Sequence, residues 1–310
     1  MLGTQAAEMA ARIERLKQER DAVLLAHYYV APEVQAVADY VGDSFALAKL
    51  AVSLPNRVLV VAGVEFMGES MKLLNPEKTV LMPDPGADCP MAHMIDKQTV
   101  DAARAEYGDD LAVVCYVNST AEAKSLSDVC VTSSNAVSVV RAMPQHHILF
   151  VPDRNLGRYV AQQVPEKHVI LNDGCCPFHA AITAQEVERL KREHPGAPVL
   201  AHPECTERVL ALADCIGSTA EIIEYAATHD APEYIVVTME GVASELERRC
   251  GASRRFLFVQ DSECPEMAKV SLAKVASCLQ DMTGEVRMAD GDASERARAA
   301  LERMLAYAGR

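Results

Sequence analysis

The chain has 310 residues, half of them hydrophobic, so it can bury a sizeable core as one large domain or two to three small ones. Its formal net charge of −14 argues against binding nucleic acid or an anionic membrane, because both need clustered cations. No apolar run is long enough to span a membrane, and the charged N-terminus predicts no secretory signal. We therefore expect a cytoplasmic location, where the ten cysteines would stay out of disulfides.

Short apolar strands alternate with helical stretches along the chain, an order typical of parallel βαβ units. After a first helix at Met9–Gln18, we expect strands at Ala22–Ala26, Tyr40–Val41, Val58–Val61 and Thr79–Met82. The middle of the chain predicts strands at Leu111–Val117, Val129–Thr132, His147–Val151 and His168–Leu171, and helices at Asp96–Glu106, Ala121–Leu126, Asn135–Ala142 and Leu156–Gln163. The last third predicts a helix at Ala184–Glu193, then strands at Pro198–Ala201, Cys215–Ile216, Tyr234–Val237 and Arg255–Val259. Helices Met267–Leu279 and Ser294–Ala308 close the chain.

Three Cys-Pro dipeptides recur at nearly equal intervals, at Cys89, Cys176 and Cys264, with steps of 87 and 88 residues. Other landmarks keep the same period. An apolar strand ends at His27, Tyr116 or His202, an aspartate follows twelve residues later (Asp39, Asp128, Asp214), and a hydroxyl five residues after that (Ser44, Ser133, Thr219). We interpret this as a threefold repeat of one small α/β unit with a four-stranded parallel sheet.

These landmarks allow a structural and a functional interpretation. The aspartates are expected to bond local backbone, and the hydroxyls to cap helices; Ser218 with Glu221 even makes a capping box. However, ligands of open α/β sheets bind outside the carboxyl ends of the strands, which is where every landmark falls. Helix N-termini at that edge would also offer N–H groups to an anionic ligand.

Three converging thiolates suit either a tetrahedral Zn²⁺ or a [4Fe–4S] cluster in which one iron has no cysteine ligand. The number of ligands does not separate these two centres. For the other seven cysteines we expect small, buried, structural side chains; they are Cys115, Cys130, Cys175, Cys205, Cys215, Cys250 and Cys278.

Several short segments resemble the quinolinate synthase family in order and spacing, over residues 24–280. They are Ala26 to Tyr29, Gly42 to Ser44, Gly63 to Met67 with Glu69, Asn75 to Lys78, Tyr116 to Asn118, Thr132 to Asn135, Pro152-Asp153 with Asn155 to Gly157, Gly174 to His179, His202 to Glu204, and Gly217 to Thr219.

The resemblance implies three pseudo-threefold-related α/β repeats, each a four-stranded parallel sheet flanked by helices in three layers, around a central [4Fe–4S] cluster. It also implies a transferase of NAD biosynthesis, which condenses iminosuccinate with dihydroxyacetone phosphate to quinolinate, phosphate and water. An L-aspartate oxidase or dehydrogenase would supply the iminosuccinate. The implied cluster ligands are Cys89, Cys176 and Cys264. Cys175 is a rival for the middle position, but the spacing from Gly174 and the Cys-Pro repeat both favour Cys176.

The resemblance further implies the residues of the active site. Substrate-binding residues would be His27, Ser44, Tyr116, Asn118, Ser133, His202, Glu204, Ser218 and Thr219, with His179 as a neighbour. Catalytic groups would be Tyr29, Tyr116, His202 and Glu204, the last as a proton acceptor or transient iron ligand. The chain departs from the family at Asn172, where many members have Trp, at Asp88, where glycine is common, and at Glu240, whose position is shifted by one.

The repeats would cover residues 1–89, completed by 265–310, then 90–176 and 177–264. Other interpretations stay open at this level. One is another three-cysteine [4Fe–4S] hydro-lyase, or a three-cysteine zinc hydrolase. A non-enzymatic iron–sulfur sensor would need a partner-binding or DNA-binding segment, and the sequence shows neither.

Overall fold

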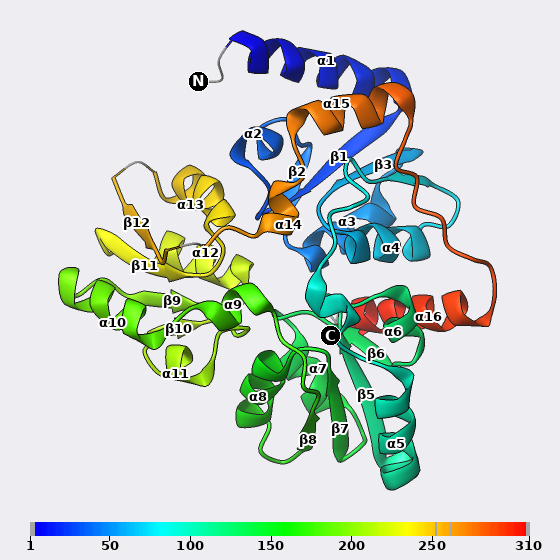
Figure 1. Ribbon diagram of the computed structural model, residues 1–310, viewed down its shortest axis with the longest axis vertical. Helices are drawn as coiled ribbons and strands as arrows, with labels where there is room; N and C mark the ends of the chain where they lie inside the picture. Colours follow the sequence, from blue (N-terminus) through cyan, green and yellow to red (C-terminus); the bar gives the residue numbers. More distant parts are fainter. Residues whose placement is uncertain (1–3, 252, 261, 308–310) are drawn as a thin grey trace. The chain divides into compact units, whose positions relative to one another are not determined.

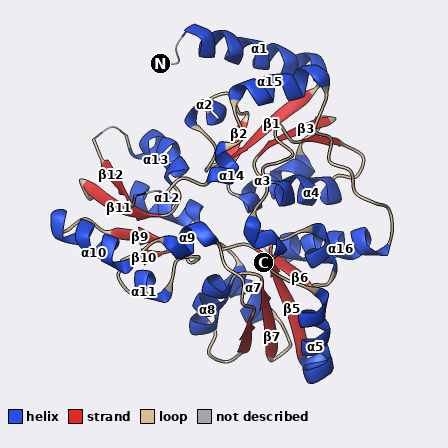
Figure 2. Cartoon of the chain, viewed as in Figure 1, coloured by secondary structure: helices blue, strands red, loops and turns tan. Residues whose placement is uncertain are grey.

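The computed structural model describes residues 4–251, 253–260 and 262–307. Within them the strands form three separate four-stranded parallel sheets flanked by helices (Figure 1; Figure 2). Each sheet takes four consecutive strands of the chain in the order second, first, third, fourth. This confirms the predicted α/β class and the recurrence of one four-stranded unit.

The first sheet has both of its inner strands fully buried. Its strands are β1 (Ala22–His27), β2 (Tyr40–Gly42), β3 (Val58–Ala62) and β4 (Thr79–Leu81), and its helices are α1 (Thr4–Arg20), α2 (Pro32–Gln35), α3 (Ser44–Ser53) and α4 (Glu65–Leu74). All residues of β1 and β3 are buried. A continuous apolar strand of this kind is expected where helices cover both faces of a parallel sheet.

The second sheet repeats the pattern between residues 90 and 171. Its strands are β5 (Leu111–Tyr116), β6 (Val129–Val131), β7 (His147–Val151) and β8 (His168–Leu171). The helices are η1 (Pro90–His93), α5 (Lys97–Tyr107), η2 (Gly108–Asp110), α6 (Ala121–Ser125), α7 (Ala136–Ala142) and α8 (Arg154–Gln163). Strands β7 and β8 have the predicted bounds, and the other predicted strands of the chain are exact or off by one residue at an end.

The third sheet consists of β9 (Val199–Ala201), β10 (Cys215–Ile216), β11 (Glu233–Val237) and β12 (Arg255–Phe258). Its helices are α9 (Pro177–Ala181), α10 (Ala184–Glu193), α11 (Glu207–Leu210), α12 (Thr219–Thr228), η3 (Glu240–Val242) and α13 (Ala243–Cys250). Helices α9 and α10 are both short because Ile182 and Thr183 are extended, and the Thr183 hydroxyl accepts the Glu186 N–H to start α10.

The C-terminal segment contains α14 (Pro265–Ala268), α15 (Leu272–Asp281) and α16 (Asp292–Tyr307). The predicted single helix Met267–Leu279 was wrong, because Ser271 is extended and its hydroxyl accepts the Lys274 N–H, which starts a new helix. Helix α15 packs along α1, and α16 packs on α4 and α6 (Figure 1). The predicted end of the last helix, Ala308, lies outside the described residues.

The described residues fall into two compact units. The first unit is drawn from Met1–Ala92, Val117–Cys130 and Cys264–Arg310, and it contains the first sheet. The second unit is drawn from His93–Tyr116 and Val131–Glu263. The bounds of the three repeats and their pseudo-threefold placement stay predictions. Among the helices of the described ranges, none is both long and apolar enough to cross a membrane.

Two of the repeated aspartates have the expected structural role. The Asp39 carboxylate accepts the Leu24 N–H at 2.7 Å, and the Asp214 carboxylate accepts the Val199 N–H at 2.8 Å. Each bond links the start of the second strand of a sheet to its first strand, so the recurrence of these residues reflects the architecture.

All ten cysteines lie in the described part of the chain, and none is in a disulfide. Cys115, Cys130, Cys205 and Cys278 are buried, as expected. The prediction of burial was wrong for Cys175, Cys215 and Cys250, which are partly exposed. Cys175 lies in a loop, Cys215 in the edge strand β10, and Cys250 at the end of α13, and each of these positions leaves one side open.

Candidate active site

A buried chain of polar contacts lies at the carboxyl ends of the strands of the second unit. Tyr116 ends β5, Glu204 follows β9, and Cys176 immediately precedes α9, which carries His179. All four side chains are almost fully buried, with exposures of 2% to 8%. Tyr116 and Glu204 were predicted as catalytic groups, Cys176 as a metal ligand and His179 as a neighbour of the substrate. The structure brings these four side chains together.

Glu204 is the centre of this chain. The Tyr116 hydroxyl donates to its Oε1 at 2.6 Å, and His179 Nδ1 lies 2.8 Å from its Oε2. Burial alone would raise the pKa of Glu204, but the neighbouring side chains of His179 and His202, with the hydrogen bonds from His179 and Tyr116, hold it below its usual range. A carboxylate in this setting stays ionised, and it can accept hydrogen bonds or bind a cation.

The His179 ring connects the carboxylate to a predicted metal ligand. Its Nδ1 also lies 3.3 Å from Cys176 Sγ, and its Nε2 lies 3.0 Å from Thr238 Oγ1, a side chain with no exposed surface. The hydroxyl of Thr238 can accept or donate, so it suits either tautomer of the ring. Both ring nitrogens are therefore engaged by named partners.

Asp153 fixes the backbone on which Cys176 lies. It is fully buried, its Oδ1 accepts the Leu156 N–H at 2.7 Å to cap α8, and its Oδ2 accepts the Cys176 N–H at 2.9 Å. Burial, followed by the negative charge of Glu204, raises the pKa of Asp153 to about 7, although the two backbone N–H groups oppose the shift. This residue belongs to the site through its contacts, although it was named from the sequence only within a family-like segment and not as a site residue.

His202 is oriented by a backbone hydrogen bond. Its Nδ1 accepts the Glu204 N–H at 3.3 Å, so the neutral ring carries its proton on Nε2. That nitrogen lies 3.3 Å from the hydroxyl of Ser133, another predicted substrate contact. The backbone carbonyl of Glu204 in turn accepts from Asn155 Nδ2 at 2.9 Å.

The same local motif recurs in the first unit. At the end of β1, His27 Nδ1 accepts the Tyr29 N–H at 3.1 Å, and the two rings lie edge to face with centroids 4.7 Å apart. His27 and His202 are thus held in one way by equivalent loops. The His-x-Tyr and His-x-Glu segments therefore share one hydrogen bond, from the backbone N–H of the third residue to the histidine Nδ1.

The predicted hydroxyl contacts lie at or near the starts of helices. Ser44 is the first residue of α3, which is capped by Asp43 rather than by Ser44. Thr219 is the first residue of α12, and Ser218 caps that helix in the expected capping box with Glu221. Asn118 follows β5 and is half-buried. Asn135 is at the N-cap position of α7, the helix that follows Ser133. None of Ser44, Ser133 and Thr219 is therefore an N-cap residue, which was the alternative role expected for each.

Comparison with known proteins covers almost the whole chain. A sequence profile described as "Quinolinate synthetase A protein" matches residues 11–306. The chain is 48% identical to a quinolinate synthase of Fusobacterium nucleatum over 97% of its own length and all of the relative's. It is 43% identical to a quinolinate synthase of Aquifex aeolicus, covering 96% of this chain and 94% of the relative. A third, from Methanoregula boonei, is 44% identical over 95% and 96% of the two chains.

This chain belongs to the quinolinate synthase family.

The three cysteines predicted to hold the cluster of a quinolinate synthase share one local structure. Each comes after the fourth strand of its sheet and directly before a proline that starts a helical turn, η1, α9 or α14. Cys176 and Cys264 also have similar extended backbones, with φ,ψ of −67°,114° and −86°,107°. Three thiolate donors in equivalent loops fit a cysteine-ligated iron–sulfur cluster. Cys89, Cys176 and Cys264 therefore fit the iron–sulfur cluster that membership of the family implies.

Within the first unit, contacts join the loops that carry Cys89 and Cys264. The Glu266 carboxylate accepts the Asp88 N–H at 3.0 Å, and Lys269 Nζ donates to the carbonyl of Gly86 at 2.9 Å. The backbone N–H of Asp88, the residue that departs from the family's common glycine, thus pairs with the helix after Cys264. Cys176 lies in the other unit.

The other departures from the family also have a structural outcome. Asn172 Nδ2 donates to the carbonyls of Met94 and Pro152, at 2.7 and 2.8 Å, so it ties two loops together. Glu240 lies exposed in η3 and takes no part in the buried contacts, whereas Thr238, two residues earlier, does. Thr238 was missed, although its place directly after β11 is the strand-end signal used for the other residues.

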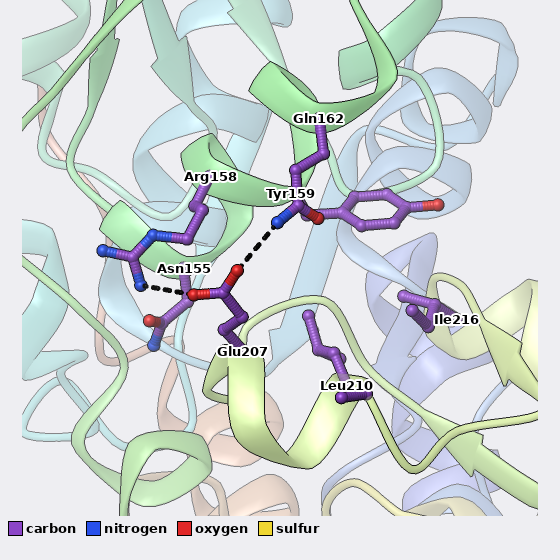
Figure 3. Close-up of a pocket in the computed structure, with 8 residues that line it drawn as sticks. Asn155, Arg158, Tyr159, Gln162, Glu207, Leu210 and Ile216 are labelled. Carbon is purple, nitrogen blue, oxygen red and sulfur yellow. Dashed lines mark hydrogen bonds and ion pairs between the residues drawn. The ribbon is translucent and has the colours of Figure 1, made fainter.

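A pocket of ≈ 280 Å³ lies elsewhere in the second unit, beside α8 and α11 (Figure 3). Arg158 and Gln162 both point to Glu207 across it, at 4.0 and 3.0 Å. Of the residues that line it, Asn155 touches the polar chain described above, through the Glu204 carbonyl. None of the predicted site residues lines this pocket.

Proposed function

We propose that this chain catalyses the condensation of iminosuccinate with dihydroxyacetone phosphate to quinolinate, with loss of phosphate and water. The observation that carries the proposal is the buried contact chain Tyr116–Glu204–His179–Cys176 in a member of the quinolinate synthase family. It places an ionised carboxylate, a phenol and an imidazole directly beside a predicted cluster ligand.

We assign Cys89, Cys176 and Cys264 as ligands of a [4Fe–4S] cluster. Bound there, the cluster would supply an iron without a cysteine ligand, which acts as a Lewis acid toward substrate oxygen. The contacts of Cys176 support the assignment over Cys175. The Cys176 N–H is held by Asp153 and its sulfur lies 3.3 Å from His179 Nδ1, whereas Cys175 is partly exposed.

Proton transfers in this reaction require groups that can accept and donate at fixed atoms. Glu204 is ionised because its pKa is lowered, and we assign its carboxylate as the transient proton acceptor; the Tyr116 hydroxyl, which donates to it at 2.6 Å, can return a proton. His202 presents its Nε2–H because its Nδ1 is held by backbone. Tyr29 occupies the position of Glu204 in the first unit's copy of the loop, and we assign it a matching role.

Substrate binding in this proposal uses neutral donors more than cations. His27, Ser44, Asn118, Ser133 and Thr219 would donate hydrogen bonds to the carboxylate and phosphate groups. Ser44 and Thr219 start ten-residue helices, whose N-terminal N–H groups favour anions. Ser218 already caps α12 through its oxygen, so its contribution to the substrate would be through its hydroxyl proton.

The reaction implies a supplier of iminosuccinate, which two-electron oxidation of L-aspartate produces. We propose an L-aspartate oxidase or dehydrogenase for this step, acting in the cytoplasm. The ten cysteines, none in a disulfide, support a reducing location.

The test is product analysis. Protein purified anaerobically and loaded with iron and sulfide is given dihydroxyacetone phosphate and iminosuccinate generated in place, and quinolinate is measured by chromatography. We expect catalytic formation of quinolinate that depends on both substrates. Cluster-loaded protein that makes no quinolinate would contradict the proposal. If the protein instead dehydrates a small hydroxy acid, the result would favour a hydro-lyase. If it converts none of the compounds tested, the result would favour a sensor.

A further inference from the structure

Three potential metal ligands already lie together inside the second unit. Cys176 Sγ, His179 Nδ1 and a carboxylate oxygen of Glu204 all lie within 4.8 Å of one another, and all three side chains are buried. This set differs from the proposed cluster ligands: it takes one cysteine instead of three, adds a histidine, and comes from one compact unit. Thiolate, imidazole and carboxylate are the three ligand types that zinc takes in proteins.

Two of the three spacings between these atoms are close to those of a mononuclear tetrahedral site, and the third, between the sulfur and the carboxylate oxygen, is within 4.8 Å. Zinc bonds of about 2.0–2.3 Å place neighbouring ligand atoms roughly 3.3–3.6 Å apart. Here Nδ1 lies 3.3 Å from the sulfur and 2.8 Å from the carboxylate oxygen. An ion would therefore replace the shared proton between His179 and Glu204 and widen that contact by about half an ångström. A fourth position would remain for water.

The surrounding contacts orient these side chains in the way that metal sites require. His179 Nε2 faces Thr238 Oγ1, so when Nδ1 binds an ion the Nε2–H donates to that hydroxyl. Tyr116 holds the other oxygen of Glu204, and Asp153 holds the Cys176 backbone. The charges also match, since one thiolate and one carboxylate with a neutral imidazole balance a divalent cation.

We propose that the cluster-free chain binds one divalent transition-metal ion through Cys176, His179 and Glu204. Binding releases the thiol proton of Cys176 to the buffer, the Nδ1 proton of the neutral His179 ring moves to Nε2, and no electron is transferred. If the proposed function is correct, such an ion shares Cys176 with the cluster and competes with its assembly. The binding site itself does not depend on that function.

Cobalt is the probe, because thiolate-bound tetrahedral Co²⁺ gives a charge-transfer band and strong visible bands. The full chain, reduced and freed of metal with a chelator, is titrated with Co²⁺. We expect one thiolate-bound ion per chain, displaced by Zn²⁺. His179→Ala and Glu204→Gln should each weaken Co²⁺ binding more than tenfold, because each removes a ligand. Thr238→Val, which removes the hydroxyl that His179 Nε2 faces, should weaken it by about 10–100-fold. Circular dichroism checks that each variant is folded. If one variant is misfolded, the comparison uses the other two.

The matched control is the double variant Cys89→Ser/Cys264→Ser, together with Cys175→Ser. Both should bind Co²⁺ as the unchanged chain does, since none of these sulfurs is in the set. The inference is overturned if folded His179→Ala and Glu204→Gln bind Co²⁺ normally, or if the band disappears in Cys89→Ser/Cys264→Ser. That second result would mean that the three cysteines bind the ion.

A competition experiment links the site to the proposed function. Chain preloaded with one Zn²⁺ should take up less iron and sulfide during anaerobic reconstitution, and a chelator should restore the uptake. Normal uptake with Zn²⁺ still bound would contradict the competition. A chain that binds Co²⁺ through His179 yet makes no quinolinate when cluster-loaded would contradict the function and leave the metal site standing.

Discussion

At the scale of single residues, the site is built from side chains whose partners are fixed before any ligand arrives. Glu204 has both oxygens engaged, His179 both ring nitrogens, and Asp153 both carboxylate oxygens. Removing one partner of such a buried pair destabilises the protein, because the other partner is left without a hydrogen bond where water cannot reach it. Two substitutions test these contacts directly.

Tyr116→Phe should destabilise the protein by about 1–3 kcal/mol, because it removes a hydroxyl that donates to a buried carboxylate. The pKa of Glu204 should rise, since that hydrogen bond helps to lower it. Denaturant unfolding measures the first effect. Tyr40→Phe, on a side chain that is 41% exposed, is the control and should change stability little. Equal unfolding midpoints for the two variants would show that the Tyr116 contact contributes nothing.

Asp153→Asn should cost about 1–3 kcal/mol, because an amide has one acceptor oxygen for the two N–H groups that the carboxylate now binds. It should also lower the iron bound after reconstitution, since the Cys176 backbone loses its anchor. Asp173→Asn, on a side chain that is 96% exposed, should stay within about 0.5 kcal/mol of the unchanged chain. Iron content and unfolding free energy that match this control would contradict the role given to Asp153.

At the scale of elements, the C-terminal helices complete the first unit. Helix α16 buries Ala297, Ala300, Leu301 and Met304 against α4 and α6, and α15 lies along α1. Arginines of α16 add hydrogen bonds to backbone carbonyls, such as Arg298 to Leu73 at 2.7 Å. The segment after the last Cys-Pro is therefore a structural part of this unit.

Leu301→Ala should lower the free energy of unfolding by about 2–5 kcal/mol, since it opens a cavity at a fully buried position. Glu302→Ala, at the exposed neighbouring position, should have little effect. Thermal or denaturant unfolding compares the two. If both variants unfold alike, the packing of α16 does not support the unit.

The contact between Asp84 and α15 predicts a pH effect. Burial would raise the pKa of Asp84, but the hydrogen bonds from Lys274 and the Gly86 N–H lower it below its usual value. A carboxylate with a lowered pKa in the folded state stabilises the protein above its unfolded pKa, and this contribution is lost as pH falls through the folded value. Asp84→Asn should thus cost about 1 kcal/mol or less near neutral pH and nothing in strong acid. A difference that persists or grows in acid would contradict this sign.

At the scale of the whole molecule, a sequence with a threefold period folds into three sheets of one strand order. Alternation of apolar strands and helices was enough to predict the strands to within about a residue. Burial on both faces makes the inner strands, such as β1 and β3, continuous apolar runs. The break between α14 and α15 was missed, since it depends on one serine cap inside an otherwise helical pattern.

The candidate site was predictable only in part, for a physical reason. Residues at strand ends, such as Tyr116 and His202, could be found from position in the repeat, whereas Glu204 was predicted only from the resemblance to the family. Contacts made by tertiary packing could not, because the spacing of Thr238 from His179 or of Asp153 from Cys176 along the chain carries no period. The role of His179 as the link between sulfur and carboxylate emerged from the folded chain.

The central claim is that one cysteine of each repeat holds the cluster on which quinolinate formation depends. The direct measurement is iron, acid-labile sulfide and quinolinate formed by anaerobically reconstituted Cys89→Ser, Cys176→Ser and Cys264→Ser, beside Cys175→Ser. The account predicts that each of the first three loses cluster and activity together, while Cys175→Ser keeps both. Full cluster and turnover in any of the three, or their loss in Cys175→Ser alone, would contradict it.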